Sequence, residues 1–156
     1  MRSLRIYIDT SVYGGLHDEE FAAPTKAFFE AIKDQGCVIL ASQVTIDELD
    51  GAPEAVRSSF QEWMAGTYVE VPITSDVEEL AQAYVDAEVL GEASFADAIH
   101  VAAATVARAD VIVSWNFKHI VNYNRIRKFN GVNALKGYTQ IDIRSPLEME
   151  DEDENV

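Results

Sequence analysis

The sequence predicts an α/β fold of three layers, α/β/α, in which a mostly parallel central sheet lies between helices. Short apolar runs alternate along the chain with longer segments of helical pattern, and strands that alternate with helices form parallel sheets. The 156 residues fit one domain and can bury a sizeable core. A hydrophobic fraction of 48% favours an ordered globular chain over a disordered one.

Five short runs rich in apolar and β-branched residues are predicted to be strands. The first follows the N-terminus directly, and the second follows Gly36, a residue typical of helix ends. The predicted strands are residues 5–8, 37–41, 68–71, 111–114 and 139–143.

Capping residues and helix breakers predict where the helices between these strands begin and end. Pro24 suits the first turn of a helix that ends at Gly36, and Ser42 suits the N-cap of the next helix. Ser75 and Glu78 have the spacing of a capping box. The predicted helices are residues 24–36, 42–49, 53–65, 75–90, 94–109 and 117–129.

The net charge of −15 is concentrated at the C-terminus. Residues 148–154 contain six of the 27 acidic residues and none of the 12 basic ones, so residues 1–147 carry −9. We therefore predict one domain over residues 1–148 and an acidic, disordered tail over residues 149–156. The acidity of the domain disfavours strong non-specific binding to nucleic acid.

One segment departs from this acidity. No Asp or Glu occurs between Asp110 and Asp142, and aromatic residues alternate there with basic ones. The segment is either a helix with a solvated basic face or a local surface that contacts phosphates. Its basic residues are Lys118, His119, Arg125, Arg127, Lys128 and Lys136.

The cellular compartment is predicted from what the sequence lacks. Cys37 is the only cysteine, which excludes an intrachain disulfide, and no apolar run is long enough to span a bilayer. The N-terminus has no apolar segment of the signal-peptide type. We expect a cytoplasmic protein with no membrane association.

Two acidic residues follow the first two predicted strands. Asp9 comes directly after the strand 5–8, at the edge where ligands gather in open parallel sheets. Its structural alternative is a turn residue that binds the next backbone amides. Glu48 lies on the short helix after the second strand, where an isolated Glu is usually solvated, and the neighbouring Asp47 offers the same chemistry.

Two more polar residues follow later in the chain. Asp97 lies in the first turn of the helix 94–109, where the helix dipole alone favours a carboxylate. Asn116 follows the strand 111–114, and its structural alternative is the N-cap of the helix 117–129.

These four positions lie on one edge of a doubly wound sheet. Carboxylates that converge in one cleft repel each other unless a cation joins them. Oxygen ligands suit Mg²⁺ or Mn²⁺, and the chain has no spaced Cys/His set for zinc. Gly14-Gly15 lacks the pattern of a phosphate-binding loop, and no Gly-x-Ser-x-Gly elbow is present.

The same segments resemble a known family. Residues 6–11 (IYIDTS), 42–49 (SQVTIDEL) and 95–102 (FADAIHVA) resemble the motifs of PIN-domain ribonucleases, with the greatest similarity to VapC-type toxins of toxin–antitoxin systems. Residues 113–120 (VSWNFKHI) and 143–148 (IRSPLE) resemble the fourth motif and the final strand of one PIN subgroup. The resemblance covers residues 5–148.

The resemblance implies a metal-dependent endoribonuclease that uses Mg²⁺ or Mn²⁺. Asp9, Glu48 and Asp97 match three acidic positions of the family, and Asn116 stands where many members have a fourth Asp. Asn116 can offer an oxygen ligand but no negative charge, so the number of metal ions at the site, one or two, remains open. Thr10 or Ser11 is expected to orient Asp9 or a bound water.

The resemblance also implies partners: an RNA substrate, an antitoxin protein and a second copy of the chain in a homodimer. The basic segment supplies candidate RNA contacts, namely Lys118, His119, Arg125, Arg127 and Lys128. His100, next to the third motif, is predicted to be a satisfied residue at the edge of the core.

Two alternatives of other classes stay open. The first is a catalytically weak or inactive PIN-like module that binds RNA or a protein partner, which Asn116 and the acidic domain favour. The second is an acidic-pocket protein such as a phosphorylated receiver domain or a small phosphatase. Against it, Thr10 and Ser11 stand where such proteins place a second acid, and no Lys follows the last strand.

Overall fold

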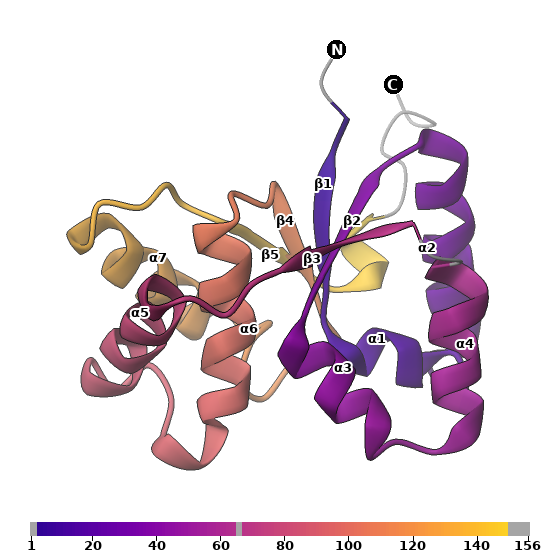
Figure 1. Cartoon of the computed structure of the whole chain (residues 1–156), viewed down its shortest axis with the longest axis horizontal. Coiled ribbons are helices and arrows are strands. Elements are labelled where there is room, and N and C mark those ends of the chain that lie inside the picture. Colours follow the sequence, from indigo (N-terminus) through magenta and orange to yellow (C-terminus); the bar gives the residue numbers. More distant parts are fainter. Residues whose placement is uncertain (1–2, 65–66, 150–156) are drawn as a thin grey trace.

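A five-stranded sheet in which all neighbours are parallel forms the centre of the molecule. A computed structural model describes residues 3–64 and 67–149. The strand order is β3-β2-β1-β4-β5, so β1 lies in the middle and the chain builds the sheet outwards on either side of it. The predicted α/β class with a parallel sheet is confirmed (Figure 1). The strands are β1 (Arg5–Ile8), β2 (Val38–Ser42), β3 (Tyr68–Val71), β4 (Val111–Val113) and β5 (Asp142–Arg144).

Helices cover both faces of the sheet, as the alternating pattern predicts. One layer, on the right in Figure 1, contains α1 (Thr10–Gly15), α2 (Ala22–Gln35) and α4 (Glu54–Met64). The other, on the left, contains α5 (Ser75–Asp86), α6 (Phe95–Val106) and α7 (Tyr123–Leu135). The short α3 (Gln43–Asp50) continues from the end of β2, and two short 3-10 helices are η1 (Glu92–Ser94) and η2 (Pro146–Met149).

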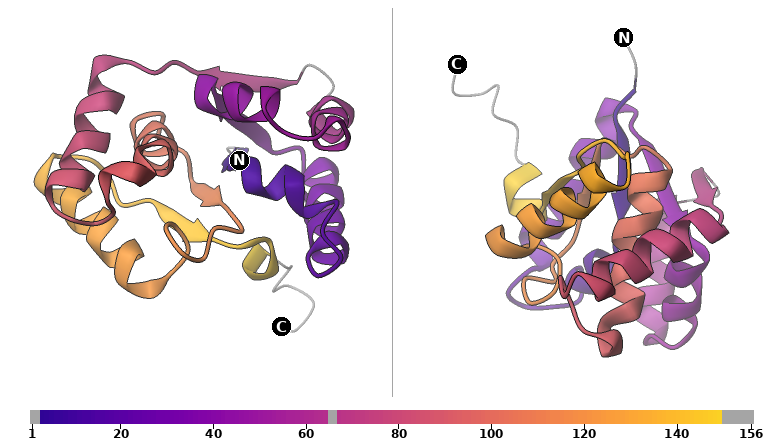
Figure 2. Two further views of the ribbon diagram at one scale, coloured as in Figure 1. Left: turned by 90° about the horizontal axis from the view of Figure 1, so that it is seen from below. Right: turned by 90° about the vertical axis from the view of Figure 1, so that its left-hand side faces the viewer.

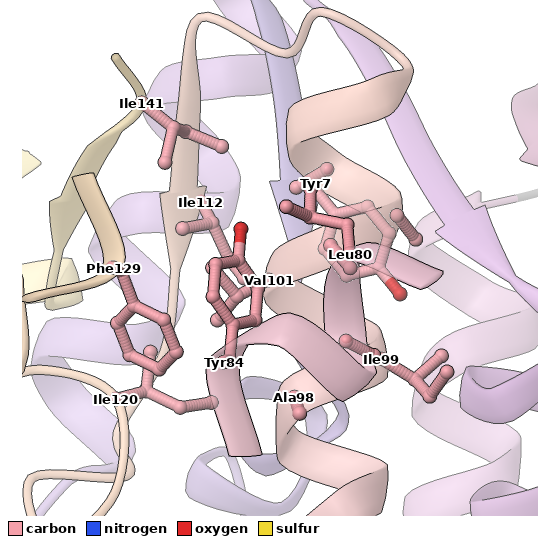
Figure 3. Packing of buried hydrophobic residues seen from close by; sticks show 14 of the residues in the cluster. Tyr7, Leu80, Tyr84, Ala98, Ile99, Val101, Ile112, Ile120, Phe129 and Ile141 are labelled. Carbon is pink, nitrogen blue, oxygen red and sulfur yellow. The ribbon is translucent and has the colours of Figure 1, made fainter. Parts of the chain in front are cut away.

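The alternation of side chains along β1 divides the core into two clusters. Ile6 and Ile8 pack with α1, α2 and α4, whereas Tyr7 packs with α5 and α6 on the other face. Figure 3 shows the second cluster, in which Tyr84 meets Phe129 edge to face with ring centroids 4.9 Å apart. Because strand positions buried on both faces need apolar residues, residues 6–8 of β1 and all of β4 are short continuous apolar runs.

Most helix boundaries follow from local chemistry, with one corrected cap. Ser42 forms a capping box with Thr45 at the start of α3, as predicted for this N-cap. The prediction that Ser75 caps α5 is wrong: Thr74 is the N-cap and its hydroxyl accepts from the Val77 amide, while Ser75 is the first helical residue. α5 ends at Asp86 rather than at residue 90, because Glu88 adopts a left-handed conformation with φ of 60°.

Two elements around the sheet differ from the sequence prediction. The chain forms α1 directly after Asp9, a six-residue helix that the sequence pattern did not predict. The predicted helix 117–129 is instead α7, whose N-cap is Asn122 with its side chain accepting from the Arg125 amide. Residues 117–121 form a turn in which the Ile120 and Val121 amides both donate to the Asn116 carbonyl.

The C-terminal part of the described chain ends in η2. Met149, which the sequence assigned to the tail, is the last residue of η2 and packs against the cluster on the α2 side. The rest of the predicted tail, residues 150–156, lies outside the described residues. Within residues 3–64 and 67–149, no helix combines the length and the apolar character needed to cross a bilayer.

Candidate active site

The predicted acidic positions lie where the strands of the sheet end and α6 begins. Asp9 follows β1, Glu48 lies on α3 just after β2, and Asp97 lies in the first turn of α6. This edge of the sheet faces downwards in Figure 1 and towards the viewer in the left view of Figure 2. The carboxyl ends of β1, β2 and β4 therefore surround one site.

Asp9 is held by two hydroxyl groups. Its side chain is buried, with the residue 4% exposed, and its Oδ2 accepts hydrogen bonds from Ser11 Oγ and Ser114 Oγ, both at 2.7 Å. Within the described chain the carboxylate makes no capping bond to α1, so the turn alternative does not account for Asp9. With Oδ2 occupied, Oδ1 is left facing His100 Nε2 at 3.4 Å.

Glu48, and not Asp47, joins Asp9. The Oε1 atom of Glu48 accepts from Thr10 Oγ1 at 2.8 Å and lies 2.5 Å from His100 Nε2. Burial opposes the charge on Glu48, but the hydrogen bonds and charge of His100, with help from Thr10, outweigh it and lower the pKa of Glu48. Asp47 is exposed and accepts from Gln43 Nε2 at 2.9 Å along α3 instead.

His100 joins these two carboxylates from the core side. The residue is completely buried, and its Nδ1 lies 2.7 Å from the Tyr7 hydroxyl, which lies 2.8 Å from Ser42 Oγ. Burial disfavours the imidazolium, but Tyr7, Asp9 and Glu48 together raise the pKa of His100 well above its ordinary value. Asp9, Glu48 and His100 each offer one ligand atom, and these atoms all lie within 4.8 Å of one another.

The structure adds a contact with the site residues to the predicted role of His100. The sequence predicted a satisfied residue at the core edge, and the side chain is indeed buried and hydrogen-bonded. Its second nitrogen, however, contacts two of the predicted site residues. The spacing of three residues from Asp97 was the available signal, since positions i and i+3 share a helix face.

Asp97 pairs with a histidine from the segment after β4. His119 Nδ1 lies 3.0 Å from Asp97 Oδ2, and the two side chains are 26% and 20% exposed. Burial first, and then the negative charge of Asp9, raise the pKa of Asp97, while His119 offsets part of this effect. The charge of Asp9 is thus one of the causes that raise the pKa of Asp97.

Asn116 caps a turn beside the site. Its Oδ1 accepts from the His119 amide at 2.8 Å, and its own amide donates to Ser114 Oγ at 2.9 Å. The capping alternative from the sequence is therefore right in kind, although the capped segment is a turn and not the helix 117–129. With its oxygen engaged in this way, Asn116 fixes the loop that carries Ser114 and His119.

Three hydroxyl residues complete the site. The two that the sequence singled out, Thr10 and Ser11, donate to Glu48 and Asp9 respectively. Ser114 was missed, although it is buried and donates to Asp9 across 105 positions of sequence. A polar residue at the end of the apolar strand β4 was the signal that pointed to it.

The candidate RNA contacts do not form one uniform face. Lys118, Arg127 and Lys128 are exposed, and the Arg127 guanidinium lies 5.5 Å from the centre of the Tyr123 ring. Arg125 is half-buried and donates to the Val89 carbonyl, and His119 points to Asp97. Lys118 and His119 adjoin the site directly, whereas the other three belong to α7.

The donor set fits a divalent cation. Asp9 and Glu48 supply carboxylate oxygens and His100 supplies a nitrogen, all within 4.8 Å of one another, whereas Asp97 lies outside this group and pairs with His119. A cation at the site would offset the negative charge of Asp9, which helps to raise the pKa of Asp97.

Comparison with solved structures identifies the fold. The chain is similar to a chain of the crystal structure of VapBC2 from Rickettsia felis bound to a DNA fragment from their promoter, at 10% identity and a TM-score of 0.58. That match covers 91% of this chain and 98% of the other. It is also similar to a chain of FitAcB from Neisseria gonorrhoeae, at 14% identity and a TM-score of 0.57, covering 92% and 99% of the two chains.

The chain has a PIN-like fold. The resemblance inferred from the motifs is thus confirmed at the level of the fold. No protein-family model matches the sequence, and no curated protein matches it either. In this chain Asp9 follows β1, Glu48 lies on α3 after β2, and Asp97 lies in the first turn of α6.

Proposed function

We propose that the protein is a metal-dependent endoribonuclease that hydrolyses RNA phosphodiester bonds as the toxin of a toxin–antitoxin pair. The observation that carries this proposal is the convergence of Asp9, Glu48 and Asp97 at one edge of the sheet. These residues come from three separate segments, and the charge of Asp9 helps to raise the pKa of Asp97.

Asp9, Glu48 and Asp97 would hold Mg²⁺ or Mn²⁺. When bound, such an ion lowers the pKa of a coordinated water and offsets charge on the phosphate. The other residues fix the carboxylates: Ser11 and Ser114 hold Asp9, Thr10 holds Glu48, and His119 holds Asp97. This rigid support keeps the oxygens in place before substrate binds.

RNA contact is assigned to the exposed cations near the site. Lys118 lies in the turn that Asn116 caps, is exposed, and directly precedes His119, which contacts Asp97. Arg127 and Lys128 extend this basic surface along α7, and Arg125 supports the adjoining loop through Val89. Phe117, 45% exposed, offers a ring on which an unpaired base can stack.

The partners follow from the structural neighbours. The neighbours are chains of VapBC2, bound to a DNA fragment from their promoter, and of FitAcB; together with the motif resemblance to VapC-type toxins they support an antitoxin partner for this chain. The homodimeric state is proposed from the motif resemblance alone. We also propose a cytoplasmic location, because the proposed RNA substrate is found there.

The test is cleavage of labelled single-stranded RNA with Mg²⁺ or Mn²⁺. We expect Asp9→Asn and Asp97→Asn to lose about 100-fold or more of the activity, because each removes a charge from the metal site but keeps the shape of the side chain. Asp47→Asn is the matched control, since Asp47 is exposed on the same helix as Glu48 and should leave the rate unchanged. Folded Asp9 and Asp97 variants that cleave at the wild-type rate would overturn the assignment.

A second candidate function is a PIN-like module without catalysis. Its support is Asn116, which brings no charge and whose amide oxygen is taken by the His119 backbone. Calorimetric titration with Mn²⁺ separates the two functions. Absence of binding at millimolar Mn²⁺ would favour the module.

A further inference from the structure

His100 extends the proposed metal site beyond carboxylates. It lies one helical turn after Asp97 on α6 and is completely buried. Its Nε2 is directed at the two carboxylates of the neighbouring segments, 2.5 Å from Glu48 Oε1 and 3.4 Å from Asp9 Oδ1. A buried imidazole that reaches two separate carboxylates is placed like a ligand and not like a core side chain.

The separations suit an ion bound between the three side chains. In octahedral geometry at about 2.1 Å, adjacent ligand atoms lie roughly 3.0 Å apart. The 3.4 Å between Nε2 and Asp9 Oδ1 is close to this value. The shorter contact to Glu48 is a hydrogen bond that an ion would replace, and the 38% exposed side chain of Glu48 has room to move outwards.

The remaining ring nitrogen has the partner that a metal-bound histidine needs. Ligating histidines donate their other N–H to an oxygen, which fixes the ring and the tautomer. Here Nδ1 lies 2.7 Å from the Tyr7 hydroxyl, and Tyr7 in turn lies 2.8 Å from Ser42 Oγ. An ion bound at Nε2 would displace the proton that Nε2 donates to Glu48; Nδ1 would then donate to Tyr7 and Tyr7 to Ser42, which leaves the lone pair of Nε2 for the ion.

We propose that His100 binds the metal through Nε2 and that this nitrogen makes the site select a first-row transition ion such as Mn²⁺ over Mg²⁺. Mg²⁺ is a hard cation that prefers oxygen ligands, whereas imidazole suits transition ions. The inference rests on the proposed function, because both use the same ion.

The experiment uses Mn²⁺ alone as the probe, bound to the full chain. Pulsed electron paramagnetic resonance detects a directly bound imidazole through its nitrogen coupling, and ¹⁵N-histidine labelling changes that signal in the unmodified protein. The chain has three histidines, so His100→Gln should abolish the coupling while His17→Gln and His119→Gln keep it. His17 is the remote control, hydrogen-bonded to Ser59.

Calorimetry measures the selectivity. We expect His100→Gln to weaken Mn²⁺ binding by about 10- to 100-fold and Mg²⁺ binding by less, so that the preference for Mn²⁺ falls. Tyr7→Phe keeps the nitrogen ligand and removes its support, so it should retain the coupling with weaker Mn²⁺ binding. This variant and the isotope experiment decide the question if His100→Gln does not fold.

The outcomes are distinct. Mn²⁺ bound without nitrogen coupling would overturn the role of His100 as a ligand and leave the proposed ribonuclease intact. Failure of Mn²⁺ to bind the wild type would overturn both. If the wild type shows the nitrogen coupling but His100→Gln loses Mn²⁺ and Mg²⁺ affinity equally, the proposed selectivity for Mn²⁺ is wrong.

Discussion

At the scale of single residues, the site balances negative charge with hydrogen-bond donors. Asp9 accepts hydrogen bonds from two hydroxyl groups, Glu48 accepts from Thr10 and His100, and Asp97 is hydrogen-bonded to His119. The residues differ in the direction of their pKa shifts, since that of Glu48 is lowered and that of Asp97 is raised. The donors around Glu48 outweigh its burial, whereas His119 offsets only part of the effect of burial and of Asp9 on Asp97.

The charge of His100 predicts how stability depends on pH in metal-free protein. Its pKa in the folded protein lies well above the ordinary value of 6.5, so the imidazolium stabilises the fold. This contribution is fully present below about pH 6.5 and is lost as pH rises through the folded pKa. Urea unfolding with a chelator should therefore show the free energy of unfolding declining over that range.

Nuclear magnetic resonance of the His100 ring gives the direct measurement. We expect the imidazolium signals to persist above pH 6.5 in chelator-treated protein. A ring that titrates at or below 6.5 would contradict the account of its surroundings.

The sequence located the three carboxylates because each follows a strand or begins a helix. It did not locate Ser114 or the contact of His100 with Glu48. Ser114 meets Asp9 across 105 positions of sequence, and the ring of His100 meets Glu48 across 52. Local pattern carries no information on which nitrogen of a buried histidine faces which segment.

At the scale of the elements, α1 connects the site to the layer of helices behind it. Gly15, the last residue of α1, lies against the indole of Trp115, whose Nε1 donates to Thr25 Oγ1 at 2.9 Å. The Trp115 backbone amide donates to Ser11 Oγ, the hydroxyl that holds Asp9. The packing of α1 therefore bears on the position of the Asp9 carboxylate.

Gly15→Ala tests this packing. A Cβ at Gly15 would lie 2.6 Å from Trp115 Nε1 and 2.8 Å from Thr25 Oγ1, so the indole must move. We expect a loss of about 1–3 kcal/mol in the free energy of unfolding, together with weaker metal binding.

Gly14→Ala is the matched control one residue earlier. Space is open there, with no described atom within 4 Å of the added Cβ, and alanine favours the helix by up to about 1 kcal/mol. Denaturant unfolding of both variants measures the difference. Equal stability of the two variants would contradict this prediction, because it would mean that the Trp115 indole moves aside at no cost in free energy.

The elements that the sequence predicted well are those with strong local signals. The strand at residues 68–71 and the cap at Ser42 match the structure. The start of α7 was predicted six residues too early, because Asn116 and Asn122 are equally good caps and Asn116 closes a turn first. Local chemistry alone does not decide between two such caps.

At the scale of the whole molecule, the charge is unfavourable for RNA outside one surface. The chain carries −15, so under the proposed function we expect RNA to approach through the exposed cations of the proposed RNA-contact segment, above all Lys118. Interactions of this kind weaken as salt increases.

Lys118→Gln tests this route. In an Asp97→Asn background that does not cleave, we expect RNA affinity to fall about fivefold, equivalent to roughly 1 kcal/mol. The salt dependence of log K should become shallower by about 0.7 for a single-stranded ligand. Fluorescence anisotropy at several salt concentrations measures both.

Lys33→Gln is the control for net charge. Lys33 is exposed on α2, in the other layer of helices, and its loss changes the charge of the molecule by the same amount. An equal effect of the two substitutions would show that RNA responds to net charge and not to Lys118.

The central place of β1 also sets the order in which the molecule can be completed during synthesis. β1 is made first, yet its partner β4 and the hydroxyl of Ser114 follow about 100 residues later, which is roughly 5–20 s of translation. Throughout that time the apolar strand at the heart of the sheet has one open edge, the kind of edge that invites pairing with other chains. The nascent protein is therefore most exposed to misassembly while the site around Asp9 is still incomplete, and synthesis of the last third of the chain completes both the sheet and that site.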